Sequence, residues 1–170
     1  MKIREGGVED VAAVLGMFDS AVAFLVARGR TGQWGADPFT GDPRRVGRVE
    51  GWAGGGGMRI AEVDGEPAGC VVVGAAHDYV SPAREPELYV QVLVIDQRFS
   101  GRGVGRALLG WALEEAGRRG VGLVRVDCYA GDDGRLVAYY EGCGFVRAEP
   151  FMVGAWPGMI LQRRLSPSGT

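Results

Sequence analysis

Three glycines at alternate positions, Gly101, Gly103 and Gly105, are the residues whose spacing points most clearly to chemistry. They follow an apolar, strand-like segment and lead into a helical pattern that begins near Val104. Glycine lets the main chain approach a ligand closely, and the first N–H groups of a helix lack partners within the helix and lie at its positive end. The junction is therefore predicted to bind an anion such as a phosphate or pyrophosphate.

Other glycine-rich loops fit this segment less well, although a plain glycine turn remains the simpler alternative. A P-loop requires Gly-Lys-Ser/Thr, and no lysine follows Gly105. A dinucleotide-binding fingerprint has an acidic residue about twenty residues further on, and Asp127 lies at a tolerable distance. In a Rossmann domain, however, the fingerprint usually follows the first strand, whereas about ninety residues of helix and strand pattern precede this loop. Its place in the chain thus argues against a nucleotide fold.

The loop resembles the pyrophosphate loop of the GNAT superfamily of N-acyltransferases, which is usually written Gln/Arg-x-x-Gly-x-Gly/Ala and lies at a strand-to-helix junction. Two registers are open in this sequence. Arg98, Gly101 and Gly103 satisfy the pattern as written. Pairing Gly103 with Gly105 fits the helix onset better and puts Ser100 at the Gln/Arg position. In that register, main-chain N–H groups would supply most of the bonds to phosphate.

A second motif lies nearer the C-terminus. Tyr140-Glu141-Gly142-Cys143-Gly144-Phe145 is similar to the Tyr-Glu-x-x-Gly-Phe segment that ends the fourth main helix of the family. The family's usual Asn at the entrance of this helix is Asp133 here, and its usual Ala is Leu136. Because Asp can cap a helix N-terminus, we predict a helix from Asp133 to Gly142. The two motifs together cover residues 87–146.

The resemblance implies that the chain transfers an acyl group from acetyl-CoA, or a related acyl-CoA, to an amine, without a metal. Main-chain groups near Leu93 and Ile95 are the expected contacts for the pantetheine arm and the thioester carbonyl. The glycine loop and the helix of the second motif complete the donor site. Its expected residues are Leu93, Val94, Ile95, Ser100, Gly101, Arg102, Gly103, Val104, Gly105, Arg106, Asp133 and Tyr140.

Two side chains are candidates for acid and base. Tyr140 matches the family's tyrosine, and a phenol can donate its proton to the leaving sulfur, the alternative being an aromatic core residue. Glu87 opens the central strand on the same alternation as Tyr89, where a carboxylate can take the amine proton directly or through water. An exposed strand end without a function is the alternative for Glu87. Asp127 and His77 are rivals for the base, and an amine that is already neutral needs none.

Aromatic residues outside the motifs are candidates for the acceptor pocket. Trp34 and Phe39 lie in a Gly- and Pro-rich loop that forms one wall of the pocket in relatives. Tyr89 shares the face of Glu87, and Trp156, in a Trp-Pro-Gly turn before the last strand, is expected in another wall. Packing alone is the alternative for each of these rings.

Strands and helices that position these residues follow from the periodicity of the chain. Alternating or apolar segments predict strands at 2–5, 58–63, 67–76, 87–95, 123–128, 145–149 and 159–163. Helices are predicted within 8–28 and at 44–53, 104–119 and 133–142, with a hairpin turn at Asp64-Gly65. With the resemblance, the fold class is α/β of the α+β type: one GNAT-like domain with a mixed, mostly antiparallel sheet of about six to seven strands, about four helices and splayed central strands.

Composition bounds the remaining alternatives. The 170 residues and the net charge of −2 suit one domain over residues 1–165, followed by a flexible tail at 166–170. Mixed charges without a basic stripe argue against a nucleic-acid partner, and the lack of a long apolar run argues against a membrane span. Three cysteines and one histidine show no metal-binding spacing. Because no basic and then apolar leader opens the sequence, a cytoplasmic protein is expected.

The sequence therefore favours an acetyl-CoA-dependent N-acetyltransferase that acts on a primary amine of a small molecule, such as an antibiotic or a metabolite. An alternative on the same fold transfers a larger acyl group or acylates a peptide or protein amine. A third hypothesis, suggested by the departures at Ser100 and Asp133, is a CoA-binding module without catalysis. Relatives often form homodimers, and the oligomeric state stays open.

Overall fold

The computed structural model describes residues 1–166 and divides the chain into two compact units. The first unit comprises residues 1–72 and 92–108, and the second comprises residues 73–91 and those from 109 onward. The tail predicted at 166–170 lies, from residue 167, outside the described residues. No helix within residues 1–166 combines the length and apolar content needed to cross a membrane.

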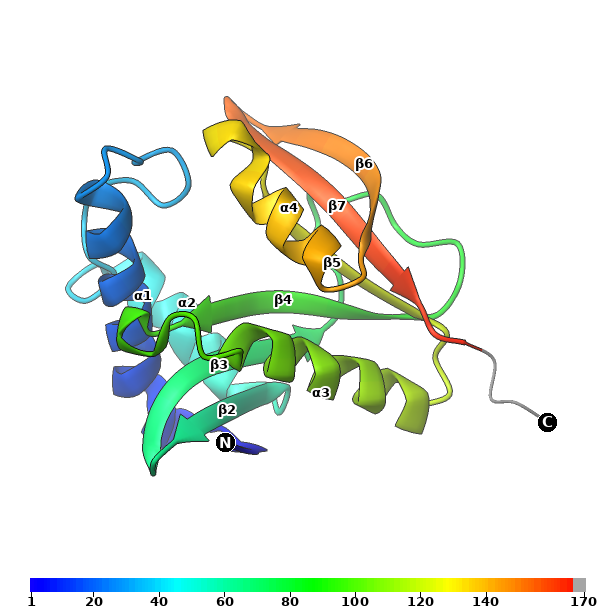
Figure 1. The fold of residues 1–170 in the computed structure, drawn as a ribbon, viewed down its shortest axis with the longest axis horizontal. Coiled ribbons are helices and arrows are strands. Elements are labelled where there is room, and N and C mark those ends of the chain that lie inside the picture. The colour runs from blue at the N-terminus through cyan, green and yellow to red at the C-terminus, as the bar shows by residue number, and fades with distance from the viewer. Residues whose placement is uncertain (167–170) are drawn as a thin grey trace. The chain divides into compact units, whose positions relative to one another are not determined.

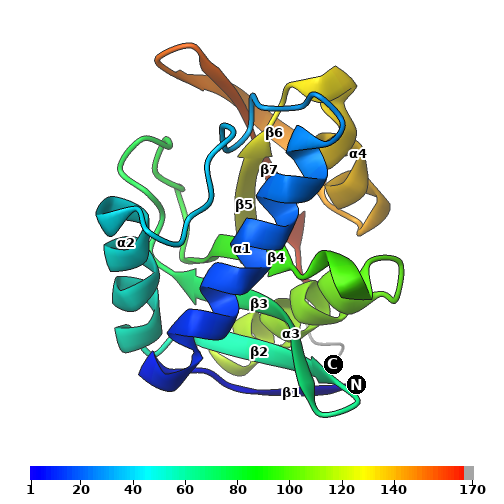
Figure 2. The same cartoon turned by 90° about the vertical axis from the view of Figure 1, so that its left-hand side faces the viewer.

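The strands follow one another in a seven-stranded sheet with the order β1-β2-β3-β4-β5-β7-β6. Figure 1 labels β2 to β7, and Figure 2 labels β1. They are β1 (Lys2–Glu5), β2 (Met58–Val63), β3 (Glu66–Gly74), β4 (Glu87–Ile95), β5 (Leu123–Tyr129), β6 (Val146–Val153) and β7 (Trp156–Arg164). The α-helices of residues 1–166 are α1 (Val11–Val26), α2 (Pro43–Gly54), α3 (Val104–Arg118) and α4 (Arg135–Gly142). The predicted fold class is thereby confirmed.

The central strands β4 and β5 are parallel, and their pairing is short. It runs from Glu87 opposite Leu123 to Val90 opposite Val126, although β4 continues to Ile95. β5 pairs with β7 in the antiparallel sense over its whole length, and β6 pairs with β7 likewise. The early end of the β4–β5 ladder agrees with the predicted splay of the central strands.

In the first unit, α1 and α2 pack against one face of the sheet, and Figure 2 shows α1 crossing in front of β2 and β3. The helical spacing of apolar residues in α1 buries Val14, Phe18 and Val22 in this core. α2 begins where Asp42 accepts hydrogen bonds from the main-chain N–H groups of Arg44 and Arg45. The strands contribute Met58, Ile60, Cys70, Val72, Val92 and Val94.

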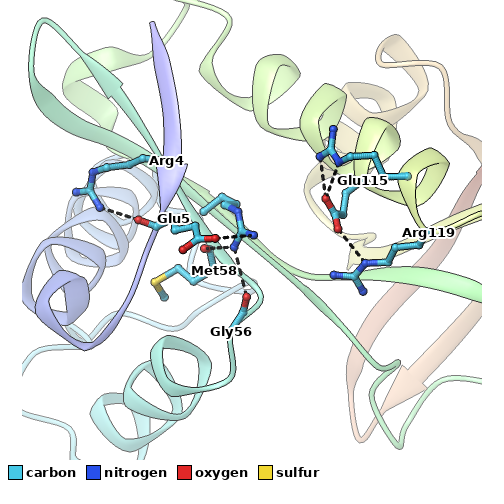
Figure 3. A network of polar contacts seen from close by, with 8 residues as sticks. Arg4, Glu5, Gly56, Met58, Glu115 and Arg119 are labelled. Carbon is cyan, nitrogen blue, oxygen red and sulfur yellow. Dashed lines mark hydrogen bonds and ion pairs between the residues drawn. The ribbon is translucent and has the colours of Figure 1, made fainter.

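Polar networks lie within each unit, and Figure 3 shows those around Glu5 and around Glu115. A further ion pair of the first unit, not drawn in that view, joins Arg4 to Asp10. In the first unit, Arg4 donates to both carboxylate oxygens of Asp10, at 2.9 and 3.1 Å, and this bonding holds the pKa of Asp10 below its usual value. In the second, Glu115 accepts hydrogen bonds from Arg118 and Arg119 at the end of α3. Basic side chains there suit the negative end of the helix dipole.

In the second unit, α4 packs against β5, β6 and β7 and buries Val137, Tyr140 and Cys143. The predicted N-cap at Asp133 is wrong. Asp133 has a φ of +60° within a 3-10 turn, and α4 follows Gly134 without a side-chain cap bond. The helix therefore begins later than predicted, because the chain turns in the left-handed region before it.

The C-terminal hairpin also differs from the prediction. β6 does not end at Glu149 but continues to Val153, and β7 begins at Trp156 rather than at Met159. Val153 pairs with Trp156 and Met152 with Pro157, so the reversal is tighter than a Trp-Pro-Gly turn would make it. The carbonyl of Pro157 accepts the N–H of Ala130 at 3.0 Å, and its ring lies near the start of the strand, where proline is tolerated.

Candidate active site

The glycine loop belongs to the first unit and connects β4 to α3. After a 3-10 turn at Gln97–Phe99, Gly101 and Gly103 take φ values of +78° and +74°, and α3 begins at Val104. Left-handed backbone costs other residues about 1–2 kcal/mol. A Cβ atom at either glycine would meet nothing within 4 Å. The left-handed backbone at Gly101 and Gly103 therefore favours glycine, and the space beside both residues is open.

The helix that follows offers donors to an anion. Its hydrogen bonding begins where the N–H of Ala107 reaches the carbonyl of Gly103 at 3.0 Å. The N–H groups of Val104 and Gly105 precede that bond and have no acceptor within the helix. α3 is 15 residues long, so its dipole adds positive potential at this end. This arrangement fits a phosphate or pyrophosphate, such as that of CoA.

Basic residues around the loop have different partners. Arg98 pairs with Asp96 at 3.3 Å and with Glu66 at 3.6 Å. Arg102 is exposed, makes no ion pair with any residue in the described range, and holds its guanidinium carbon 5.6 Å from the ring centre of Phe99. Of the two arginines, Arg102 is therefore the one without an acidic partner in the described part of the chain.

The other residues predicted to bind the acyl donor have side chains that are buried in a core, half-buried or exposed. The Val94 side chain is buried in the core of the first unit, and the half-buried side chains of Leu93 and Ile95 point to the opposite face. Ser100 and Arg106 are exposed around the start of α3, and so is Asp133 in the second unit.

Tyr140 lies on α4 in the second unit and is only 6% exposed. Its ring contacts Phe145 and Tyr139 edge-on, with centroids 6.0 and 5.5 Å apart. Within residues 1–166 its hydroxyl has no hydrogen-bond partner. Burial raises the pKa of this phenol well above its usual value, which keeps it protonated and able to donate.

Glu87, the predicted base, forms a buried ion pair in the second unit. Nε and NH2 of Arg125 donate to its two carboxylate oxygens, the NH2 bond being 3.0 Å long. The third guanidinium nitrogen donates to the carbonyl of Ser81 at 2.9 Å. The side chains of Arg125 and Glu87 are 6% and 15% exposed. Both oxygens of Glu87 are thus engaged in joining β4 to β5.

Asp127 points to the same face of β5 as Arg125. Its hydrogen-bond partners are tyrosine hydroxyls rather than a cation. The hydroxyl of Tyr89 donates one hydrogen bond to it, and that of Tyr79 a longer one of 3.5 Å. Burial raises the pKa of Asp127 above its usual value, although the bond from Tyr89 opposes this shift. Burial and the neighbouring carboxylate also raise the pKa of Tyr89.

The predicted acceptor residues do not form one group. Phe39 is buried in the core of the first unit, stacked on Phe18 with centroids 4.4 Å apart, and Arg45 lies 4.2 Å from its ring centre. Trp34 is half-buried against the same core. Tyr89 and Trp156 both belong to the second unit, where Tyr89 is fully buried with its hydroxyl on Asp127.

Sequence reasoning missed Arg125 and Tyr79. Arg125 is an isolated charge in an apolar strand, two residues before Asp127, and this was the available signal for a buried ion pair. Tyr79 lies in a polar loop whose path no periodicity specifies, so its bond to Asp127 had no signal in the sequence.

The strand, glycine loop and helix define an acyl-CoA-binding fold, and the comparisons agree. The model of the acetyltransferase (GNAT) family matches residues 29–145, and the chain belongs to this family. An uncharacterised N-acetyltransferase of Methanocaldococcus jannaschii is 30% identical over 105 residues, which are 61% of this chain. The match spans only 44% of that relative.

Solved structures share the fold over nearly the whole chain. A GNAT-family acetyltransferase of Listeria monocytogenes has a TM-score of 0.74 at 21% identity, covering 96% of this chain and 94% of its own. A putative phosphinothricin N-acetyltransferase has a TM-score of 0.72 at 24% identity, covering 98% and 99%. A putative acetyltransferase of Salmonella typhimurium, solved with its cofactor acetyl-CoA, has a TM-score of 0.62 at 18% identity, covering 99% and 96%.

Proposed function

We propose that the protein transfers the acetyl group of acetyl-CoA to a primary amine of a small molecule. The observation that carries this proposal is the junction from β4 to α3, where two left-handed glycines face open space before the N-terminus of a long helix. Membership of the acetyltransferase family supports the same conclusion. The pyrophosphate of the donor binds at Gly101–Gly105, and main-chain groups of Leu93–Ile95 hold its pantetheine arm.

The reaction is a direct transfer. The amine nitrogen attacks the thioester carbonyl carbon, so that a C–N bond forms and the C–S bond breaks. The Tyr140 hydroxyl gives its proton to the departing thiolate and is reprotonated from water. A carboxylate takes the proton that the amine nitrogen loses and releases it to solvent. From a neutral amine the products are an N-acetyl amine and CoA thiol, because the proton released by the carboxylate balances the one that Tyr140 takes up. An amine that arrives as an ammonium releases one further proton to solvent.

For the base we choose between two carboxylates of the second unit. Glu87, the candidate from the sequence, would have to break its ion pair with Arg125 before it accepts a proton. Asp127 forms no ion pair within residues 1–166, and its raised pKa brings its basicity closer to that of an amine. Asp127 therefore takes the proton, and Glu87 holds Arg125 in place.

A thiol-release assay tests the proposal with acetyl-CoA and a panel of aminoglycosides, polyamines, arylalkylamines, amino acids and short peptides. Tyr140→Phe is expected to lower kcat on the active amine by about 100-fold while CoA binding is retained. Tyr139→Phe, next to it on the exposed side of α4, is the matched control and should retain activity.

Other results would replace the proposal. Turnover of peptides alone would favour the peptide acyltransferase, and turnover only with longer acyl-CoA donors would favour the larger-acyl enzyme. Tight CoA binding without thiol release on any amine would indicate a non-catalytic module. Failure to bind CoA would contradict the donor itself. The cytoplasmic location and the homodimer stay predictions.

A further inference from the structure

Aromatic rings line up beside Asp127 in the second unit. Tyr79 stacks on His77 with centroids 5.0 Å apart and on Phe151 with centroids 5.6 Å apart. Phe151 continues to Trp156 at 6.2 Å, and Tyr89 meets His77 edge-on at 5.6 Å. We call His77, Tyr79, Tyr89, Phe151 and Trp156 the ring row. Its most exposed member is Tyr79, at 47%.

Strand register places Asp127 and the strand residues of the ring row, Tyr89, Phe151 and Trp156, on one face of the sheet. Gly158 of β7 lies opposite both Tyr129 of β5 and Phe151 of β6, so the side chains of these two residues share a face. Asp127 precedes Tyr129 by two residues and therefore points to that face as well. The Phe151 ring lies directly on Gly158, since a Cβ atom there would be 2.3 Å from it. The missing side chain of Gly158 leaves room for the Phe151 ring on this face.

Asp127 forms no ion pair within residues 1–166, although the nearby His77 and Arg125 lower its pKa through their charge. Glu87 on the same face has Arg125, whose three nitrogens are all used by Glu87 and Ser81. Within residues 1–166, the hydrogen-bond partners of Asp127 are the hydroxyls of Tyr79 and Tyr89, which carry no positive charge. A buried carboxylate is stable mainly when it is paired, so a cationic ligand would supply the missing partner.

We infer that the acceptor is a primary amine on an aromatic or apolar body without an acidic group, whose ammonium pairs with Asp127 while its body lies along the ring row. This inference rests on the proposed function and specifies its substrate class. An ammonium beside aromatic rings is favoured by their negative faces, and the flat body by ring contacts. An α-amino acid would bring its own carboxylate toward Asp127, where the two negative charges repel each other. After binding, the ammonium gives a proton to Asp127, and the neutral nitrogen attacks the thioester carbon.

The first test compares amines that differ by one carboxylate. Tyramine and tyrosine form one pair, and 2-phenylethylamine and phenylalanine form another. We expect kcat/KM to be at least about tenfold higher for the amine of each pair, as about 1.4 kcal/mol of charge repulsion would give. Equal rates within each pair, or a preference for the amino acid, would overturn the inference.

Variants then separate the charge from the rings. Asp127→Asn should weaken tyramine binding about tenfold or more, measured by calorimetry in the presence of CoA so that no turnover is needed. Tyr79→Phe keeps the ring and loses the hydroxyl that lies 3.5 Å from Asp127, so it should weaken binding less than Tyr79→Ser does. Tyr79→Ser loses the ring and should weaken binding about fivefold. Val146→Ala, on an exposed part of β6, is the control and should change nothing.

The proposed substrate class and the proposed function can be disproved separately. If amino acids or peptides are acetylated but arylalkylamines are not, the proposed function stands and the substrate class is wrong. If CoA binds but no amine releases thiol, the proposed function fails, and calorimetry still decides the amine site. Tyramine binding that is lost in Asp127→Asn would support that site, whereas binding that is absent in wild type or unchanged in the variant would overturn it.

Discussion

The glycine loop of the first unit and the face of the second unit that carries Glu87 and Asp127, called here the carboxylate face, differ in the groups that they offer to a ligand. The loop offers main-chain N–H groups, and the absence of side chains at Gly101 and Gly103 leaves them open. Glu87 on β4 and Asp127 on β5 are both acidic and point to this same face. Glu87 has an arginine as its partner, however, whereas Asp127 has two tyrosine hydroxyls. A site made of main-chain groups can therefore be predicted from the local sequence. The role of a side chain in a sheet depends instead on which residue of the neighbouring strand lies next to it.

The largest expected effect follows from removing the ion pair between Glu87 and Arg125. Glu87→Gln leaves Arg125 buried without its counter-charge, and removing one partner of a buried ion pair costs about 3 kcal/mol or more. We expect the free energy of unfolding in urea at neutral pH to fall by that amount, with an unchanged dependence on urea. Asp127→Asn is the matched control and should change the stability by less than about 1 kcal/mol. Equal losses in the two variants would show that the carboxylates play the same structural role.

Local sequence was sufficient for the loop and for most elements. β1, β2 and β4 have the predicted bounds, because their apolar runs end at glycine, proline or acidic residues that also end the strands. The bounds at Asp133 and Trp156 were missed, since a left-handed turn and a strand continued by pairing with its neighbour leave no periodic signal. For the same reason Glu87 could be placed on the face but not assigned its partner. Arg125 is 38 residues away in the sequence and becomes its neighbour only through the parallel ladder.

The glycine loop gives the intermediate effect. Gly103→Ala forces a Cβ atom onto a residue with a φ of +74°, at about 1–2 kcal/mol, and fills space beside the expected phosphate. We expect CoA affinity, measured by calorimetry, to fall about tenfold, as 1.4 kcal/mol gives. Gly110→Ala is the control, because Gly110 lies within α3 and a Cβ there meets nothing within 4 Å. It should stabilise the helix by about 0.5–1 kcal/mol and leave CoA affinity unchanged. Similar CoA affinity in both variants would argue against a main-chain phosphate site.

The smallest effect is the pH dependence that Asp127 contributes. Burial raises its pKa in the folded state above the ordinary value of 3.8, so the folded protein holds this proton more tightly than the unfolded chain does. Its contribution to stability is therefore greatest below the unfolded pKa and declines as the pH rises through the folded pKa. Asp10, whose pKa is lowered, acts in the opposite sense and loses its contribution as the pH falls. The difference in unfolding free energy between wild type and Asp127→Asn removes the Asp10 term, because both proteins contain it. As the pH rises from 3 to 7, the unfolding free energy of the wild type should fall relative to that of Asp127→Asn. A relative rise would mean that a cation of the protein, rather than a ligand, already pairs with Asp127.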